Sequence, residues 1–272
     1  MNLATLEGVS TEELTKAWNR CWEGYPYATK FREHQMEAWI EKCKIDLAHS
    51  MSLKDNGEIV GFSFLAVDGL EGWVAGACID PLYRGNNLFT DLFRKQLEKA
   101  QELDMVKVTL EVLENNHAIR VYSKLGFQIQ RELLLFRYKG EDLSLKPRKK
   151  GVFLRKVSLD EYFLARNVGG FKPPWQRRES YLRSFAPLEA WLNNDGSSGA
   201  LFLGPGELLL DAWVSNWQEA EKLISWILSF SKGDLNLLNQ PKDYLTAYLT
   251  QQGLSPTDIQ YEMIAYLPVI ES

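Results

Sequence analysis

The sequence of 272 residues lacks several features that mark common classes of protein. It has three cysteines and three histidines, and neither set has the spacing of a metal site or a disulfide framework. No apolar run is long enough to cross a bilayer, and the first residues lack the basic start and apolar core of a signal peptide. We therefore expect no metal centre, no membrane association and a reduced, cytoplasmic setting.

The charge balance excludes a further class of partner. Lys and Arg number 31 against 36 Asp and Glu, which gives a formal net charge of −5. General nucleic-acid binding needs a basic surface, so we expect none. The histidines His34, His49 and His117 are scattered, and no Ser-His-Asp set is visible. Hydrophobic residues make up 45% of the chain, enough for a packed core in one large or two ordinary domains.

The most informative stretch is a strand, a polar turn and a helix between residues 73 and 102. Residues 73–79 are apolar or small and predict a buried strand, which Pro81 ends because proline cannot donate to a ladder. The polar turn 84–87 follows, and from Leu88 the apolar residues recur at helical spacing. A helix N-terminus carries unpaired N–H groups and suits a phosphate, and Arg84 adds a guanidinium for the same purpose.

A second motif follows in the same stretch. Residues 106–112 predict another strand, and Asn115 can cap a short helix that contains Tyr122 and ends at Gly126. Residues 127–138 predict a further strand.

Together these motifs resemble the GNAT superfamily of acyl-CoA-dependent N-acetyltransferases, over about residues 1–138. They read D-P-x-Y-R-G-x-x-L and N-x-x-A-I-x-V-Y-x-K-x-G-F. Asn87 stands where the family usually has glycine, and Phe89 where it has glycine or alanine, although Asn tolerates unusual backbone angles. The loop before Asn115 is one residue shorter than the common pattern, so Asn116 is an alternative for its role.

The resemblance implies acetyl-CoA as cosubstrate and coenzyme A as product. In the family a backbone N–H of the strand before the phosphate loop polarises the acyl carbonyl, which points here to Cys78, Ile79 and Asp80. The residues expected to contact the coenzyme are Cys78, Ile79, Asp80, Arg84, Gly85, Asn86, Asn87, Leu88, Phe89, Thr90, Asn115, Tyr122 and Lys124.

Two side chains are candidates for proton transfer. The resemblance makes Tyr122 the acid that protonates the leaving thiolate, and a phenol has a pKa of about 10, near that of a thiol. A tyrosine on such a helix otherwise packs in the core. Glu111 is the candidate base because a glutamate among strand hydrophobes is unusual, unless it lies on an exposed face. Glu114, Asp80 and a chain of waters are the alternatives.

The first 70 residues predict two helices and a hairpin. Ser10 or Thr11 can cap a first helix, and residues 32–43 predict a second. Strands 45–53 and 59–67 flank the turn Asp55-Asn56-Gly57. In the resembling family the early helices and their loop form a wall of the acceptor site. Tyr25 and Tyr27 are therefore candidate substrate contacts, or they pack on the neighbouring helix.

The second half carries no clear catalytic motif but repeats the order of elements. It predicts a hairpin over 201–214, helices 217–230 and 241–252, and strands 235–238 and 260–267. Leu249 stands where the first half has Tyr122, and residues 214–216 contain neither arginine nor glycine. We expect a degenerate GNAT-like domain without a coenzyme site, or else an unrelated α+β domain. Trp175, Arg177 and Arg178 are its candidates to line the acceptor side.

These expectations combine into one prediction of fold and function. The fold is α+β, with a GNAT-like mixed sheet flanked by helices over 1–140, a linker over 141–151, and a smaller GNAT-like domain over 152–272. The chain is predicted to acetylate a primary amine of a small molecule or a protein, by direct attack in a ternary complex, as a monomer or homodimer. The alternative is a non-catalytic acyl-CoA sensor or interaction module.

Overall fold

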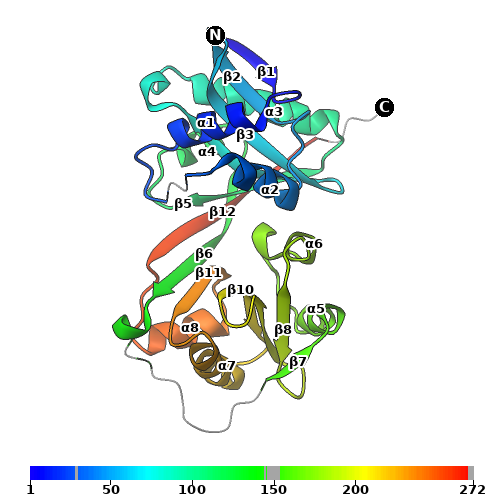
Figure 1. The fold of residues 1–272 in the computed structure, drawn as a ribbon, viewed down its shortest axis with the longest axis vertical. Coiled ribbons are helices and arrows are strands. Elements are labelled where there is room, and N and C mark those ends of the chain that lie inside the picture. Colours follow the sequence, from blue (N-terminus) through cyan, green and yellow to red (C-terminus); the bar gives the residue numbers. More distant parts are fainter. Residues whose placement is uncertain (28–29, 144, 146–153, 269–272) are drawn as a thin grey trace. The chain divides into compact units, whose positions relative to one another are not determined.

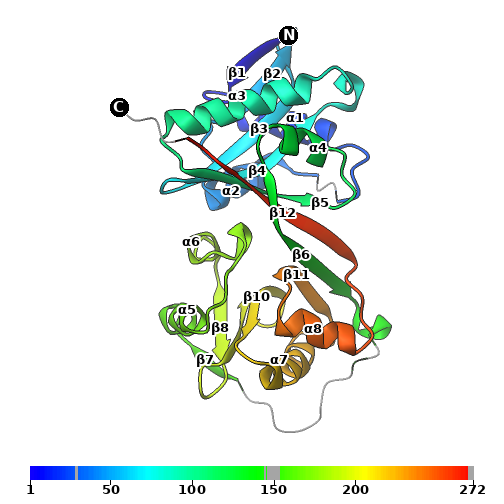
Figure 2. The same ribbon diagram turned by 180° about the vertical axis from the view of Figure 1, so that it is seen from behind.

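The computed structural model describes residues 1–27, 30–143, 145 and 154–268, and the chain divides into two compact units (Figure 1). Unit 1 comprises Met1–Gln130 and Met263–Ser272, and unit 2 comprises Arg131–Glu262. The chain leaves unit 1 along strand β6 (Gln128–Tyr138) and returns along strand β12 (Asp258–Tyr266) (Figure 2). The division therefore falls inside a strand rather than at residue 140, and most of the expected linker lies outside the described residues.

Unit 1 contains a mixed sheet with the strand order β1-β2-β3-β4-β5. Neighbouring strands are antiparallel except β4 and β5, which are parallel. Strand β12 lies next to β5, and the Leu267 N–H donates to the Val106 carbonyl at 3.0 Å. The elements are β1 (Asn2–Thr5), α1 (Thr11–Cys21), α2 (Glu33–Cys43), β2 (Met51–Asp55), β3 (Glu58–Asp68), β4 (Glu71–Ile79), the 3₁₀ turn η1 (Pro81–Tyr83), α3 (Leu88–Glu102), β5 (Lys107–Leu113) and α4 (Ile119–Lys124).

Local chemistry explains where several of these elements begin. The Ser10 side chain accepts from the Glu13 N–H at 3.2 Å and caps α1, as predicted. Asn56 and Gly57 both have positive φ, the geometry that a two-residue hairpin turn requires. The strand predicted from residue 45 begins only at Met51, because Asp46 accepts from the N–H of His49 and holds a turn there.

Unit 2 contains an antiparallel sheet of four strands with the order β10-β9-β8-β7, and β11 pairs with β6. The predicted helix 217–230 is confirmed, whereas the elements before residue 198 had no clear sequence signal. The elements are β7 (Arg155–Val157), α5 (Leu159–Val168), the 3₁₀ turn η3 (Trp175–Arg177), α6 (Glu179–Leu182), β8 (Leu188–Leu192), β9 (Ser198–Leu203), β10 (Leu208–Val214), α7 (Trp217–Phe230), β11 (Leu235–Pro241) and α8 (Tyr244–Gln251); a short 3₁₀ turn, η2 (Gly140–Asp142), precedes them.

A buried ionic cluster holds the interior of unit 2 together. Asp211 accepts from Arg177 Nε at 2.6 Å, from Arg166 Nη1 at 2.8 Å and from the Tyr162 hydroxyl at 2.9 Å. Both arginines are at most 2% exposed, and Trp175 is 3% exposed. The prediction that Arg177 lines the acceptor side is therefore wrong, because its guanidinium is packed against Asp211 inside this unit, whereas the role of Trp175 stays a prediction.

The described residues lack two features. No described helix has the length and apolar character needed to span a bilayer. No described group of three or more His, Cys, Asp or Glu side chains is arranged to hold a metal ion.

Candidate active site

Strands β4 and β5 pair along only part of their length. The parallel ladder runs from Glu71 opposite Lys107 to Trp73 opposite Thr109, and a 2.8 Å ion pair joins Glu71 to Lys107 at its start. Beyond Trp73 the structure records no pairing between the two strands within its described residues, although β4 continues to Ile79. The sheet thus opens along the second half of β4.

A bulge in β4 sets the direction of the groups that face this opening. Phe64 pairs with Gly76 and Leu65 with Val74, so Ala75 is the extra residue. Residues 75–77 are small and only half-buried. Small side chains at a bulge leave the backbone accessible to another molecule.

The register then decides which N–H groups point toward the opening. The Asp80 N–H donates to the Val60 carbonyl at 2.8 Å, so residues 80 and 78 face β3 in the antiparallel alternation. Ala77 and Ile79 therefore direct their N–H groups to the other side, where β5 diverges. Of the three expected carbonyl donors only Ile79 faces the opening, and Ala77 was missed because the register cannot be read from the sequence.

The loop after β4 presents a cluster of backbone donors. Gly85 has a φ of +89° and Asn87 a φ of +58°, so Asn87 adopts the left-handed conformation that glycine usually provides. Within the described part of the chain, the N–H groups of residues 85–89 have no hydrogen-bond acceptor. They lie at the N-terminus of the 15-residue helix α3, where the helix dipole is positive. This arrangement favours an anion.

Arg84 has two backbone partners among the described residues, and its contact with a phosphate stays a prediction. Its Nε donates to the Ile79 carbonyl and its Nη2 to the Cys21 carbonyl, each at 3.1 Å. The guanidinium thus ties the end of α1 to the end of β4. In this arrangement the attraction for an anion comes from the backbone of the loop.

Asp80 is also held inside the protein. Its Oδ2 accepts from Arg20 Nε at 2.6 Å, and its Oδ1 accepts from the Leu82 N–H at 2.9 Å. The side chain is buried. Both carboxylate oxygens therefore stabilise the turn η1 and its link to α1, which disfavours Asp80 as the base.

Tyr122 lies in an aromatic cluster beneath the start of α3. Its ring centroid is 4.9 Å from that of Phe93, 5.8 Å from that of Phe89 and 5.9 Å from that of Phe127. The large Phe89 side chain thus packs against Tyr122 and Phe93. Burial raises the pKa of Tyr122, because the charged phenolate loses its contact with water. The phenol is therefore protonated at neutral pH, and it is a weaker acid than an exposed tyrosine.

The two cysteines near the opening are protonated as well. Burial raises the pKa of the Cys78 thiol to about 11 and that of the Cys21 thiol to about 12. Cys78 Sγ donates to the Cys21 carbonyl at 2.7 Å. Because the thiolate is the nucleophilic form, neither side chain suits an acyl-cysteine intermediate.

Glu111 lies on β5 and is connected to β4. Its Oε2 accepts from the Trp73 indole N–H at 2.6 Å, and the side chain is half-buried. The carboxylate therefore lies beside the last paired residue of the ladder, where the opening begins. Its alternative, Glu114, is exposed.

The helix of the second motif begins later than predicted. Ala118 is the N-cap of α4, and Asn116 Oδ1 accepts from the Ala118 N–H at 2.9 Å. The prediction that Asn115 caps this helix is wrong, because the turn before the helix is held by Asn116, the alternative, and the cap residue is Ala118. Asn115 and Lys124 are exposed, and no described hydrogen bond links either side chain to the loop 84–87.

An aromatic wall formed by Trp18, Trp22 and Tyr25 covers one side of β4. The ring centroid of Trp22 lies 5.5 Å from that of Trp18 and 4.7 Å from that of Tyr25. A Cβ atom added to Gly76 would come within 3.0 Å of the Trp18 indole, so only glycine fits there without a shift of the ring. Tyr27 follows in the same loop and is 40% exposed.

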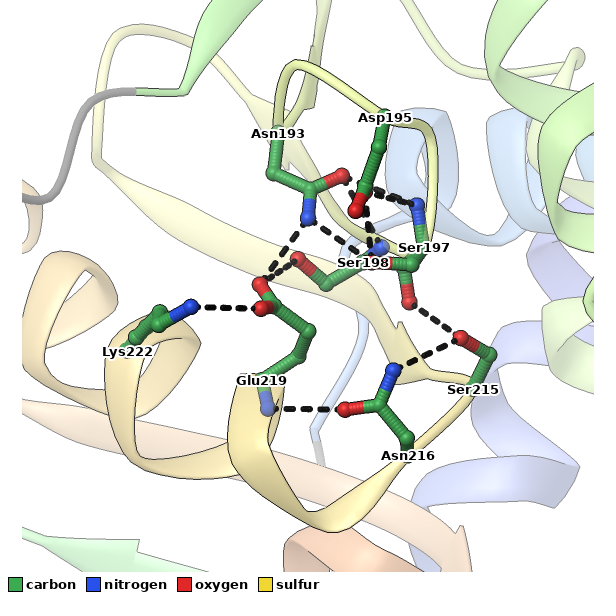
Figure 3. Close-up of polar contacts among 8 residues, drawn as sticks. All are labelled: Asn193, Asp195, Ser197, Ser198, Ser215, Asn216, Glu219 and Lys222. Carbon is green, nitrogen blue, oxygen red and sulfur yellow. Dashed lines mark hydrogen bonds and ion pairs between the residues drawn. The ribbon is translucent and has the colours of Figure 1, made fainter.

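The junction of β10 and α7 in unit 2 corresponds to the loop of unit 1 but is closed by its own side chains (Figure 3). Asn216 Oδ1 accepts from the Glu219 N–H at 3.2 Å and caps the helix. The Glu219 carboxylate accepts from Asn193 Nδ2 at 2.9 Å and pairs with Lys222 Nζ at 2.7 Å. Leu249, at the position of the tyrosine, is fully buried.

Comparisons with known sequences agree with this geometry. Residues 11–127 match the acetyltransferase (GNAT) family. A spermine/spermidine N(1)-acetyltransferase of Bacillus subtilis is 32% identical over 127 residues, which cover 40% of this chain and 82% of that protein. A candidate ribosomal protein bS18-alanine N-acetyltransferase of the same organism is 30% identical over 82 residues, covering 30% of this chain and 54% of that protein. The chain thus spans about half the length of the latter relative.

Comparisons with solved structures extend the likeness to the whole chain. A candidate acetyltransferase from Pyrococcus horikoshii has a TM-score of 0.69 at 12% identity, covering 100% of this chain and 91% of that one. A tandem GNAT protein from the clavulanic acid biosynthesis pathway has a TM-score of 0.64 at 14% identity, covering 97% and 98%. These matches confirm the predicted fold, with a GNAT-like unit followed by a second one.

Proposed function

The chain belongs to the GNAT family of acetyltransferases, and from that premise we propose that it transfers an acetyl group from acetyl-CoA to a primary amine. The observation that carries this proposal is the opening of the sheet between β4 and β5 beside a loop of unpaired backbone donors. The acyl thioester extends from a diphosphate in this cosubstrate. The loop suits the diphosphate, and the adjacent opening between β4 and β5 suits the thioester.

The residues present fit the coenzyme. The N–H groups of residues 85–89 would hold the pyrophosphate with the favourable dipole of α3, and Gly85 leaves open space above the loop. Asn86 and Leu88 take part through this backbone, whereas the Thr90 N–H donates to the Asn87 carbonyl, so Thr90 is a proposed contact through its side chain. Lys124 and either Asn115 or Asn116 are proposed contacts for the remainder of the molecule.

We assign the transfer chemistry to groups that face the opening. The N–H groups of Ala77 and Ile79 would polarise the acetyl carbonyl, where negative charge develops as the amine attacks. The new C–N bond forms as the C–S bond breaks, and Tyr122 would give its proton to the departing sulfur. Glu111, or a water that it orients, would take the proton from the amine. The protonated cysteines favour this direct transfer over a covalent acyl-enzyme.

The named relatives suggest where to look for the acceptor. One is named for spermine and spermidine and the other for an alanine of a ribosomal protein. Both kinds of named acceptor carry a primary amine: the polyamine is a small molecule, and the alanine belongs to a protein. Spermidine and a peptide with N-terminal alanine are therefore the first two acceptors to assay.

Two measurements test the proposal in sequence. Acetyl-CoA should raise the melting temperature of the chain by binding the folded state, and an amine acceptor should then release free thiol from acetyl-CoA. Stabilisation without thiol release across a broad amine panel would support the alternative of a non-catalytic acyl-CoA sensor. No stabilisation at saturating acetyl-CoA would sink both.

A further inference from the structure

The indole of Trp73 is bonded to the carboxylate of the proposed base, Glu111. Its Nε1–H donates to Glu111 Oε2 at 2.6 Å. Trp73 is 2% exposed, so water hardly competes for its N–H group. A hydrogen bond to a carboxylate in such surroundings is stronger than the same bond on the surface, because the local dielectric is low. The indole therefore holds the carboxylate firmly.

The register of the strands explains why these two side chains meet. Trp73 is paired with Thr109 in the parallel ladder of β4 and β5, and Glu111 follows two residues later on β5. Paired residues of neighbouring strands share a face of the sheet, and so do residues two apart on one strand. Trp73 and Glu111 therefore lie on the same face, with the carboxylate just beyond the last pair of the described ladder, where the sheet opens.

The bond is not needed to join the two strands. The ladder and the 2.8 Å ion pair between Glu71 and Lys107 already join them at this end of β4. A glutamine at residue 111 could accept the same bond from the indole, without the desolvation cost of a half-buried charge. The charge of Glu111 therefore indicates a role beyond the link, and proton transfer at the opening supplies one.

We propose that Trp73 is the positioning residue of Glu111: its indole N–H fixes the carboxylate at the opening and stabilises the ionised form that accepts a proton. This assignment rests on the acetyl transfer proposed above. As the C–N bond forms and the C–S bond breaks, the proton passes from the amine nitrogen to a carboxylate oxygen of Glu111, directly or through a water. Trp73 exchanges no proton and acts through Glu111.

The first test removes the donor and keeps an aromatic ring. Trp73→Phe should lower kcat by about tenfold to a hundredfold and leave the dissociation constant of acetyl-CoA within about twofold, because a hydrogen bond to the base is lost and the phosphate loop is untouched. Thiol release is measured at saturating acetyl-CoA with the amine that the unaltered chain acetylates fastest. Trp191→Phe is the matched control in unit 2 and should leave kcat unchanged, since the Trp191 indole N–H has no acceptor among the described residues.

A double-mutant cycle separates positioning from packing. Glu111→Gln should lower kcat by about 10²–10⁴-fold, as the loss of a base does. In that background Trp73→Phe should have little further effect on kcat, because the carboxylate through which the indole acts is gone. If Trp73 contributed by packing alone, the two losses would multiply instead.

Glu111→Asp decides the matter if Trp73→Phe fails to fold. The shorter side chain keeps a carboxylate but withdraws it from the indole by one methylene, so kcat should fall about as far as expected for Trp73→Phe.

The outcomes separate this inference from the proposed function. If the unaltered chain releases no thiol with any amine, the acetyl transfer is refuted and the assignment falls with it. If the unaltered chain is active, the assignment alone is refuted by an unchanged kcat in Trp73→Phe, Glu111→Asp or Glu111→Gln, or by losses that multiply in the cycle.

Discussion

The two units begin a helix in opposite ways at corresponding places. At α3 the N–H groups of residues 85–89 are unpaired among the described residues, and Gly85 and Asn87 have positive φ. At α7 the extended Asn216 caps the helix, and Glu219 places a buried carboxylate in its first turn. When side chains of the protein accept from the first N–H groups of a helix, these groups have little affinity left for an external anion. When the N–H groups are unpaired, the affinity is retained.

The difference shows how a binding site can be lost while its fold is kept. Asn193 and Lys222 stabilise the Glu219 carboxylate, so unit 2 has an internal anion where unit 1 is proposed to hold an external one. The sheet and helix of unit 2 persist because side chains of the unit itself bond the polar groups at the junction of β10 and α7. The following predictions test this contrast, beginning with the largest effect.

The largest expected effect is an all-or-none difference between the units. Titration calorimetry should give one acetyl-CoA per chain, bound at the α3 loop, because the α7 start is already satisfied by Asn216 and Glu219. Weak sulfate binding at α7 would leave the contrast intact. Two equivalent acetyl-CoA sites would break it.

Replacement of the proposed acid comes next. Tyr122→Phe removes the proton donor and keeps the ring contacts with Phe93 and Phe127, so turnover should fall by about 10²–10⁴-fold with little change in acetyl-CoA affinity. Single-turnover thiol release and a binding titration measure the two separately. Leu249→Met, at the matching position of unit 2, is the control and should leave both unchanged. Wild-type turnover in Tyr122→Phe would mean that the tyrosine only packs.

The ionic cluster of unit 2 should dominate its stability. Asp211→Ala leaves Arg166 and Arg177 buried without their counter-charge, which should cost about 3–5 kcal/mol of unfolding free energy. Asp160→Ala is the matched control: it breaks an exposed pair with Arg183 and should cost at most about 1 kcal/mol. Denaturant titration followed by tryptophan fluorescence measures both. Equal losses would mean that the buried cluster has no special weight.

A smaller effect should follow when unit 1 is given the charge that unit 2 has. Asn87→Asp places a carboxylate at the start of α3, where it should compete with the pyrophosphate and weaken acetyl-CoA binding by about tenfold, or about 1.4 kcal/mol. Asn56→Asp makes the same change at a residue with a similar positive φ, in the hairpin between β2 and β3. An unchanged dissociation constant in Asn87→Asp would remove the loop from the binding site.

The smallest expected effect concerns pH. Because burial raises the pKa of Tyr122 above its ordinary value, the phenol keeps its proton past the pH at which an exposed tyrosine loses it. Turnover should therefore rise with pH as the amine becomes neutral, and up to pH 10 it should stay within about twofold of its maximum. Loss of rate between pH 8 and 9 would indicate that a group with a lower pKa is the acid.

The sequence allowed the local parts of this contrast to be predicted. The order of strand, polar turn and helix at residues 73–102 follows from periodicity and turn chemistry, and so does the helix 217–230. The absence of glycine and arginine at residues 214–216 already distinguished the second junction from the first. These features depend on residues close together in the chain.

The remaining parts depend on partners far away in sequence. The direction of the Ala77 N–H follows from the register of β3 and β4, and the buried position of Arg177 follows from its pairing with Asp211 on β10. Arg84 has the charge that suits a phosphate, yet its guanidinium meets the carbonyl of Cys21, at the end of α1. The residues next to Arg84 in the sequence do not indicate whether its guanidinium bonds a ligand or a distant backbone carbonyl.

The return of β12 into unit 1 has a consequence for how this protein is made. Strand β5 completes its edge only when residues 263–267 arrive, and the Leu267 N–H bonds to the carbonyl of Val106. The ribosome synthesises the chain from its N-terminus, so all of unit 2 is made before residues 263–267. Unit 2 can therefore fold while the sheet of unit 1 still has an exposed, unpaired edge. A nascent chain halted before residue 263 would carry the phosphate loop and the tyrosine, yet it would leave that edge open to chaperones or to other chains.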